Sequence, residues 1–192
     1  TATPTARLGL PEVKLGLLPG AGGTQRLPRL LKNPAKTVQM VGSGNPISGS
    51  AAADIGLVDD VAENAVEAAV VLARGLNGQI VEDRRLSTIA LELTDTINAE
   101  FDAAIADIAK KAKGAIAPVR AAEVVRAAYS IPFEEGLALE RSTFMELVVS
   151  DQSKALRHIF FAERQAPKPP KDVTGTPREV KKVGIIGSGT MG

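Results

Sequence analysis

The sequence has no cysteine and no tryptophan, and it holds one histidine and one tyrosine among 192 residues. Without cysteine there can be no disulfide, no thiolate metal ligand and no cysteine nucleophile, which fits a reducing compartment. An excess of one charge is also lacking, since 23 basic and 22 acidic residues leave a formal charge of +1. This balance favours neither nucleic acid nor an anionic membrane surface as a partner. Apolar runs are short and interrupted by charge, so we predict no transmembrane segment.

The residues that are present are typical of a globular protein. Hydrophobic residues make up 44% of the chain, enough for a sizeable core. The first residues show no basic-then-apolar pattern, so no secretory signal is predicted. The chain starts with threonine rather than methionine, and its last residues belong to a motif that requires a following helix. We therefore expect both ends to be cuts in a longer protein.

Glycine and proline divide residues 1–62 into short elements, because proline restricts helix interiors and glycine favours turns. Leucine spacing and capping serines mark the helices. We predict an extended segment at Leu8–Val13, a loop at 19–23, helices at 24–31, from about 34 and at 48–55, and a short strand at 57–61.

Residues 63–165 form a long stretch rich in alanine, leucine, glutamate and arginine, which predicts a helical module. The predicted helices are 63–76, 86–112, 118–130, 133–149 and 151–165. Residues 166–180 contain four prolines and alternating charge, typical of a solvated linker. At 181–187 the chain turns to valine and isoleucine, which predicts the first strand of a new domain over residues 181–192.

The last six residues, Gly187-Ser188-Gly189-Thr190-Met191-Gly192, match the dinucleotide-binding pattern G-x-G-x-x-G. In that pattern the first glycine makes a tight turn, the second lets a pyrophosphate approach the backbone, and the third lets helix pack on strand. The position directly after a predicted strand supports this interpretation. The alternative is an ordinary glycine turn, and the motif alone leaves NAD, NADP and FAD open.

Glu12 is the candidate catalytic residue near the amino terminus. It lies among apolar neighbours in Leu10-Pro11-Glu12-Val13, and a carboxyl group lining a pocket there could transfer protons. The glycine-rich loop that follows, at 19–23, could admit a ligand close to backbone amides. A solvent-facing glutamate and a plain helix entry explain the same residues equally well.

A family resemblance decides between these interpretations. Residues 8–27, LGLPEVKLGLLPGAGGTQRL, closely resemble the signature of the crotonase (enoyl-CoA hydratase/isomerase) superfamily, and Ile47–Asp59 resembles its following helix and strand. The order of this segment, a helical module, a proline linker and VGIIGSGTMG is similar to the multifunctional β-oxidation enzymes. Those fuse a hydratase to an L-3-hydroxyacyl-CoA dehydrogenase.

The resemblance implies a fold that is α/β overall and mostly helical in this chain. Residues 1–62 would be the carboxyl-terminal part of a crotonase ββα spiral, and 63–165 a helical module with inter-domain helices. Residues 166–180 would be the linker, and 181–192 the first strand and turn of a Rossmann domain. The implied activity is hydration of trans-2-enoyl-CoA followed by oxidation of L-3-hydroxyacyl-CoA.

The resemblance also implies roles for individual residues. Glu12 matches the family glutamate that donates a proton to the α-carbon; a second glutamate and two oxyanion-hole N–H donors would precede residue 1. Because family isomerases can work with one carboxylate, an isomerase or hydrolase stays open, as does an inactive helical spacer. The residues implied to contact substrate are Pro19, Gly20, Gly22 and Glu163.

NAD is the implied cofactor, held through its pyrophosphate by Gly187, Gly189, Met191 and Gly192. The implied partners are an acyl-CoA thioester and either a thiolase subunit or further copies of the chain, with no metal. The expected compartment is a bacterial cytoplasm, with peroxisome and mitochondrion left open. His158 and Asp151 are expected on a helix surface and at a helix cap, outside any catalytic role.

Overall fold

The computed structural model describes residues 1–170, 172, 175–176, 178–187 and 189. Within these ranges the chain is mostly helical, as predicted, and has one small sheet in which β1 (Arg7–Leu8) pairs antiparallel with β2 (Ile47–Ser48). The α-helices are α1 Gly23–Leu31, α2 Pro34–Ser43, α3 Gly49–Asp54, α4 Ala65–Gly75, α5 Asp95–Ala112, α6 Ile116–Ala127, α7 Phe133–Val148 and α8 Asp151–Gln165. Three 3-10 helices complete them: η1 Pro11–Leu15, η2 Val81–Arg84 and η3 Leu86–Thr88.

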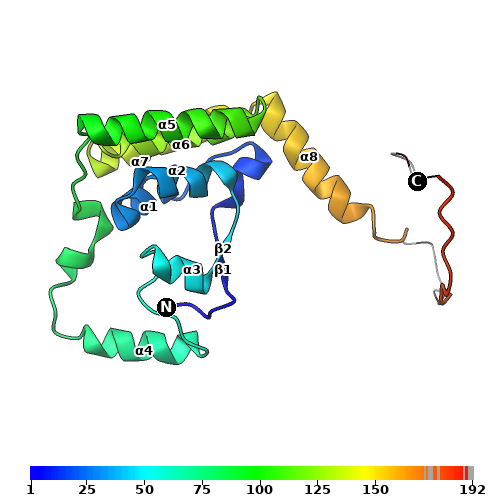
Figure 1. Cartoon of the computed structure of the whole chain (residues 1–192), viewed down its shortest axis with the longest axis horizontal. Helices are drawn as coiled ribbons and strands as arrows, with labels where there is room; N and C mark the ends of the chain where they lie inside the picture. The colour runs from blue at the N-terminus through cyan, green and yellow to red at the C-terminus, as the bar shows by residue number, and fades with distance from the viewer. Residues whose placement is uncertain (171, 173–174, 177, 188, 190–192) are drawn as a thin grey trace.

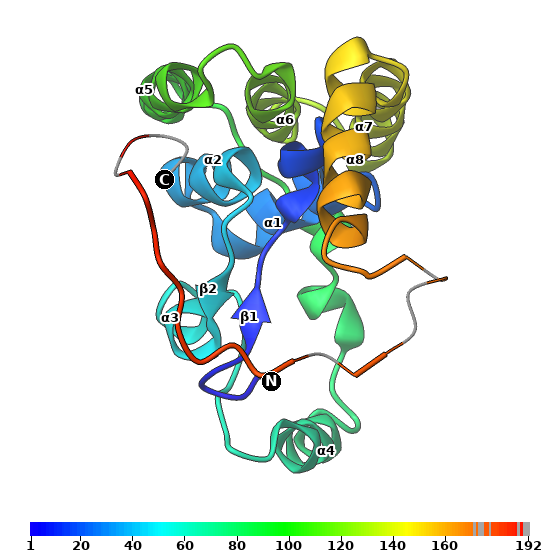
Figure 2. The ribbon, with the colours of Figure 1, turned by 90° about the vertical axis from the view of Figure 1, so that its right-hand side faces the viewer.

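The helices pack in two layers (Figures 1 and 2). Helices α5, α6 and α7 lie side by side in one layer, and α1 and α2 lie beneath them. The β1–β2 pair and α3 lie on the far side of α1 and α2. Helix α8 extends away from the layers, and α4 lies apart and buries none of its residues.

The hydrophobic core lies between the two layers. It joins Val13, Leu18 and Val38 from the first 62 residues to Phe101 and Val125 from the helical module. Each of these side chains is at most 5% exposed, and burying one stabilises the fold by about 1.5–3 kcal/mol. The two predicted segments, 1–62 and 63–165, therefore share one core.

Side-chain caps explain where most helices begin. The first turn of a helix has N–H groups without intrahelical acceptors, and a preceding Ser, Thr or Asn can accept from one of them. Five residues do so here: Asn33 before α2, Ser48 before α3, Asn64 before α4, Thr94 before α5 and Ser150 before α8.

Two short predictions near the amino terminus were wrong. Leu8–Val13 is extended only in β1; Pro11 starts η1 instead, because its fixed φ suits the first turn of a helix. Residues 57–59 form bends and residue 60 has no regular structure, and Val61 makes an isolated bridge to Ala2, so the predicted strand is not formed. A strand must pair with a neighbouring strand over several residues, and the single bridge between Val61 and Ala2 does not provide that pairing.

The predicted helix 86–112 is in fact two elements. η3 ends at Thr88, residues 89–93 carry no regular structure, and α5 begins after its cap Thr94. The carbonyl of Ile89, which a continuous helix would use internally, accepts a hydrogen bond from the guanidinium of Arg29 at 3.2 Å.

The predicted strand 181–187 is not formed. These residues are exposed and have no regular secondary structure, and Ile186 is 100% exposed. A parallel strand requires neighbouring strands on its edges, and none of the described residues lies beside this segment as a strand. Met191 and Gly192, predicted to bind the cofactor, lie outside the described residues.

Tyr129 is the buried aromatic residue at the end of α6. Its ring packs edge-to-face on Phe101, with ring centroids 5.1 Å apart, and the side chain is 5% exposed. Its hydroxyl has no hydrogen-bond partner among the described residues. Burial raises the pKa of Tyr129 to about 12; the nearby Glu100 also raises it, and Arg29 lowers it.

An absorbance titration should therefore find this tyrosine ionising near pH 12 rather than near its ordinary value of 10. The chain has no other tyrosine and no tryptophan, so the tyrosinate signal belongs to Tyr129 alone. The folded state holds this proton more tightly than the unfolded chain does, so protonated Tyr129 adds to the free energy of unfolding. This stabilisation, about 3 kcal/mol, is complete below pH 10 and is lost as the pH rises through 12.

The control is the variant Tyr129→Phe, whose unfolding free energy should lack that decline. The urea-unfolded chain should titrate near 10. A folded wild-type chain that also titrates near 10 would contradict the burial argument.

Candidate active site

Glu12 lies on η1, the single 3-10 turn between β1 and α1. Pro11 begins the turn, and Gly16 ends it in the left-handed conformation with φ 69°. The N–H of Gly16 donates to the carbonyl of Val13 at 3.0 Å, and that of Leu17 to the carbonyl of Glu12 at 3.1 Å. The carbonyl of Glu12 is thereby fixed by the backbone that follows the turn.

The carboxyl group of Glu12 has an unused acceptor. Its Oε2 atom is buried and has no hydrogen-bond partner among the described residues. A buried acceptor without a donor costs free energy, so such atoms often point to a ligand or a partner. This is the property expected of a carboxyl group that acts on a substrate.

The first turn of α8 packs directly against η1. Ser153 is fully buried, and its hydroxyl donates to the carbonyl of Leu15 at 2.8 Å. A Cβ at position 16 would lie 2.8 Å from Cα of Ser153, so only glycine allows this approach. Residues 15–16 and 153 thus connect the predicted catalytic turn to a helix 138 positions away.

The predicted substrate loop, 19–23, packs on α7. Pro19 and Gly22 are buried, whereas Gly20 is exposed. A Cβ at Gly20 would lie 2.7 Å from the ring of Phe144 on α7. Gly22 has φ 83°, a left-handed conformation that glycine adopts without strain, and serves as the residue before α1.

Glu140 of α7 is the site residue that the sequence interpretation missed. It is 2% exposed, and its carboxylate accepts hydrogen bonds from Gly22 N at 2.6 Å, Thr24 N at 2.9 Å and Thr24 Oγ1 at 2.6 Å. Its one sequence signal was an acidic residue on the apolar face of a helix, at helical spacing from Leu137 and Phe144.

This contact occupies two amides at the start of α1. The amides of Gly22 and Thr24 face Glu140, and the negative charge sits where the helix dipole favours it. The predicted substrate contacts at Pro19, Gly20 and Gly22 stay predictions; of these residues Gly20 is the exposed one.

The two arginines of α1 also have structural partners. Arg26 Nη1 donates to the carbonyl of Ala21 at 2.7 Å, and its guanidinium lies 5.5 Å from the ring centre of Phe133. Arg29 is 3% exposed, and burial lowers its pKa. Its Nη1 donates to the carbonyl of Gln25 at 2.8 Å.

Glu163, the remaining predicted substrate contact, is exposed on the outer part of α8. Ten residues separate it from Ser153, which is about 15 Å along a helix. The structure therefore does not bring Glu163 together with Glu12. On the same helix His158 is exposed, and Asp151 pairs with Lys154 at 3.2 Å while Ser150 supplies the cap.

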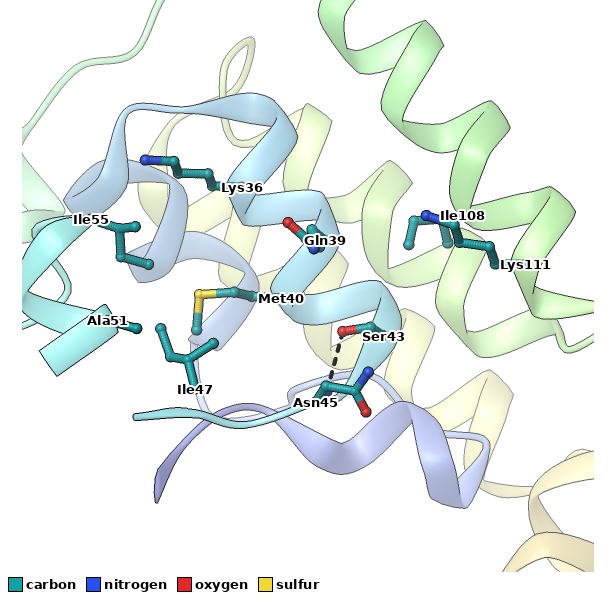
Figure 3. A pocket seen from close by; sticks show the side chains of 10 residues that line it. All are labelled: Lys36, Gln39, Met40, Ser43, Asn45, Ile47, Ala51, Ile55, Ile108 and Lys111. Carbon is teal, nitrogen blue, oxygen red and sulfur yellow. Dashed lines mark hydrogen bonds between the residues drawn. The ribbon is translucent and has the colours of Figure 1, made fainter. Parts of the chain in front are cut away.

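Two hollows lie near this site, and Glu12 lines neither of them. A cavity of about 350 Å³ opens between α2, β2, α3 and α5 (Figure 3). Lys36 and Lys111 project at its rim, and Met40, Ile47 and Ile55 form its apolar wall. A second, mainly apolar hollow of about 290 Å³ borders the signature segment at Leu10 and Gly23.

The cofactor glycines do not form a binding site within the described residues. Gly187 has φ 102°, and neither Gly187 nor Gly189 has an atom within 4 Å of where a Cβ would lie. The flanking strand and helix that a dinucleotide site needs are not present there. No group of three potential metal ligands occurs among the described residues either.

Comparison with known proteins identifies the family. The family model for enoyl-CoA hydratase/isomerase matches residues 1–102, more than half of the chain and the segment that carries Glu12 and the loop. The chain belongs to this family. The match also extends past residue 62 into α4 and α5, in keeping with the shared core.

Relatives match nearly the whole chain. The peroxisomal bifunctional enzyme of Danio rerio is 40% identical and that of Homo sapiens 37%, each over 97% of the chain and 27% of the relative. The fatty acid oxidation complex subunit alpha of Shewanella sp. MR-4 is 39% identical over 96% of the chain and 27% of the relative. The chain therefore spans about a quarter of the length of these proteins, which come from both bacteria and animals.

Among solved structures, a carnitinyl-CoA dehydratase from Mycobacterium avium 104 is similar, with TM-score 0.49 and 24% identity. That similarity covers 82% of this chain and 50% of the other. No helix among the described residues is long and apolar enough to cross a membrane.

The contact between Gly16 and Ser153 yields a prediction for stability. Gly16→Ala should lower the free energy of unfolding by more than the 1–2 kcal/mol that left-handed geometry alone costs, because the new methyl group also meets the backbone of Ser153. Urea unfolding monitored by circular dichroism measures the change.

The matched control is Gly75→Ala, at the end of α4, where a Cβ would have open space. This variant should keep or slightly raise stability. Equal effects of the two substitutions would contradict the close packing of η1 against α8.

Proposed function

We propose that this chain is part of a bifunctional enzyme that hydrates trans-2-enoyl-CoA and then oxidises the L-3-hydroxyacyl-CoA product with NAD. The observation that carries the proposal is the similarity to a bifunctional enzyme over 97% of the chain, at 40% identity. The unpartnered carboxylate oxygen of Glu12 supports it.

In the hydration step, water adds its oxygen to C3 of the enoyl group and C2 receives a proton. We assign the proton donation at C2 to the carboxyl group of Glu12, whose buried Oε2 has no competing donor. A second carboxylate, absent from this chain's signature segment, would hold the water and accept the proton that the water loses as its oxygen bonds to C3. The thioester and its acyl chain are the proposed ligand.

For the second step, NAD would accept the hydride. We assign its pyrophosphate to the turn containing Gly187, Gly189, Met191 and Gly192, on the motif alone. A thiolase subunit or a second copy of the chain remains the proposed partner. A bacterial cytoplasm is the proposed location, with peroxisome and mitochondrion as the alternatives.

An isomerase is the second candidate, because the family that matches residues 1–102 includes enoyl-CoA isomerases and one carboxylate can move a double bond. Giving the enzyme a 3-enoyl-CoA distinguishes the two. Conversion to the 2-enoyl isomer without water addition would favour the isomerase.

The test of the proposed role is Glu12→Gln in the full-length enzyme, with crotonyl-CoA loss measured for hydration and NADH for oxidation. The amide cannot donate the proton, so hydration should fall by about 10²–10⁴-fold. NADH formation from L-3-hydroxybutyryl-CoA should be unchanged, because that reaction does not involve Glu12.

The matched control is Glu135→Gln, an exposed glutamate in the first turn of α7, which should hydrate at the wild-type rate. Hydration at the wild-type rate by Glu12→Gln would overturn the assignment. Crotonyl-CoA loss without NADH in the wild-type enzyme would remove the dehydrogenase from the proposal.

A further inference from the structure

The buried carboxylate of Glu140 has no cationic partner. Among the residues that the structure describes, no lysine or arginine forms an ion pair with it, and all its observed hydrogen bonds come from the start of α1. Burying a charge in this way is costly unless its hydrogen bonds are good. The donor distances of 2.6–2.9 Å are those of charge-assisted bonds.

These three hydrogen bonds fix the position of the loop 19–23 relative to the first turn of α1. Gly22 N lies before the helix and Thr24 N inside its first turn, so one carboxylate spans the junction. Phe144, one turn along α7, fills the space above Gly20. Helix α7 thus supports the loop through one charged and one aromatic side chain.

A second contact holds α7 against the loop 19–23 and the start of α1. Gly136 has no side chain, which allows the carboxamide of Gln25 to pack against α7. The same carboxamide donates to Thr24 Oγ1 at 3.2 Å and to the carbonyl of Val124 on α6 at 3.3 Å. The start of α1 is therefore joined to two helices of the other layer.

The chain between this junction and Glu12 has little freedom to adjust. Residues 16–19 are all buried, and Leu18 is fully so. Ser153 fixes one end at Leu15, and Glu140 fixes the other at Gly22. A shift of the loop would have to move η1, and with it the carboxyl group of Glu12.

We propose that Glu140 is a positioning residue for the proton-transferring acid Glu12, acting through the hydrogen bonds from Gly22 and Thr24. This rests on the proposed function. The carboxylate does not touch the substrate; it sets where the turn with Glu12 lies relative to the ligand.

The experiment compares Glu140→Gln with Leu147→Ala in the full-length enzyme, at a temperature where both are folded. One of the two carboxylate oxygens becomes an NH₂ group in the glutamine and can no longer accept from the N–H of Gly22 or Thr24. The loop is then held less firmly at the start of α1. Loss of alignment by about 1 Å costs up to 10²-fold in rate, so we expect kcat for hydration to fall ten- to a hundredfold with KM nearly unchanged. Hydrogen exchange should rise in a peptide covering residues 20–27.

Leu147 is buried on the same helix and makes none of the hydrogen bonds to Gly22 and Thr24, which all end on Glu140. Leu147→Ala should lower the melting temperature while keeping kcat and the exchange of residues 20–27. This separates positioning from a general loss of stability. An equal loss of kcat in both variants would overturn the proposal.

If Glu140→Gln does not fold, Thr24→Val tests the same contact, because it removes one of the three hydrogen bonds and keeps the side-chain shape. It should lower kcat several-fold, and wild-type kcat would overturn the proposal. Wild-type kcat in Glu140→Gln with an inactive Glu12→Gln would overturn the positioning role alone. Wild-type hydration by Glu12→Gln would overturn the proposed function as well.

Discussion

The start of α1 must find acceptors for N–H groups that lie in the interior. Every helix leaves its first N–H groups without intrahelical partners, and here Gly22 and Thr24 are buried, so water cannot serve them. The acceptor comes from Glu140, more than 110 residues along the chain. The signature loop therefore reaches its conformation only when α7 is docked on it. The rest of the site depends on this one carboxylate.

Features set by neighbouring residues could be predicted from the sequence. The helix near 48 was predicted because capping serines precede residues that favour helix, and the structure confirms the cap at Ser48. The helix near 34 was predicted from Pro34 at its first turn, and α2 begins there. The loop at 19–23 followed from its glycines. The family followed from the signature of residues 8–27, and the family match confirms it.

Features set by distant partners could not be predicted in this way. Glu140 resembles any glutamate on a helix until Gly22 and Thr24 are placed against it. The bends at 57–61 and the break at 89–93 depend on a bridge to Ala2 and on Arg29. The segment 181–187 has the composition of a strand but lacks neighbouring strands, and β structure requires them.

The two ends of the described chain differ in whether distant residues bond to them and pack on them. The backbone groups of Leu15, Gly22 and Thr24 are bonded by Ser153 of α8 and Glu140 of α7, whereas the isoleucines at 185–186 are exposed. Helices α7 and α8 are thus structural parts of the surroundings of Glu12. Since η1 is fixed at Leu15 by Ser153 and the loop at Gly22 by Glu140, the geometry around Glu12 depends on these two side chains of α8 and α7. Loss of either contact should therefore act first on the position of Glu12.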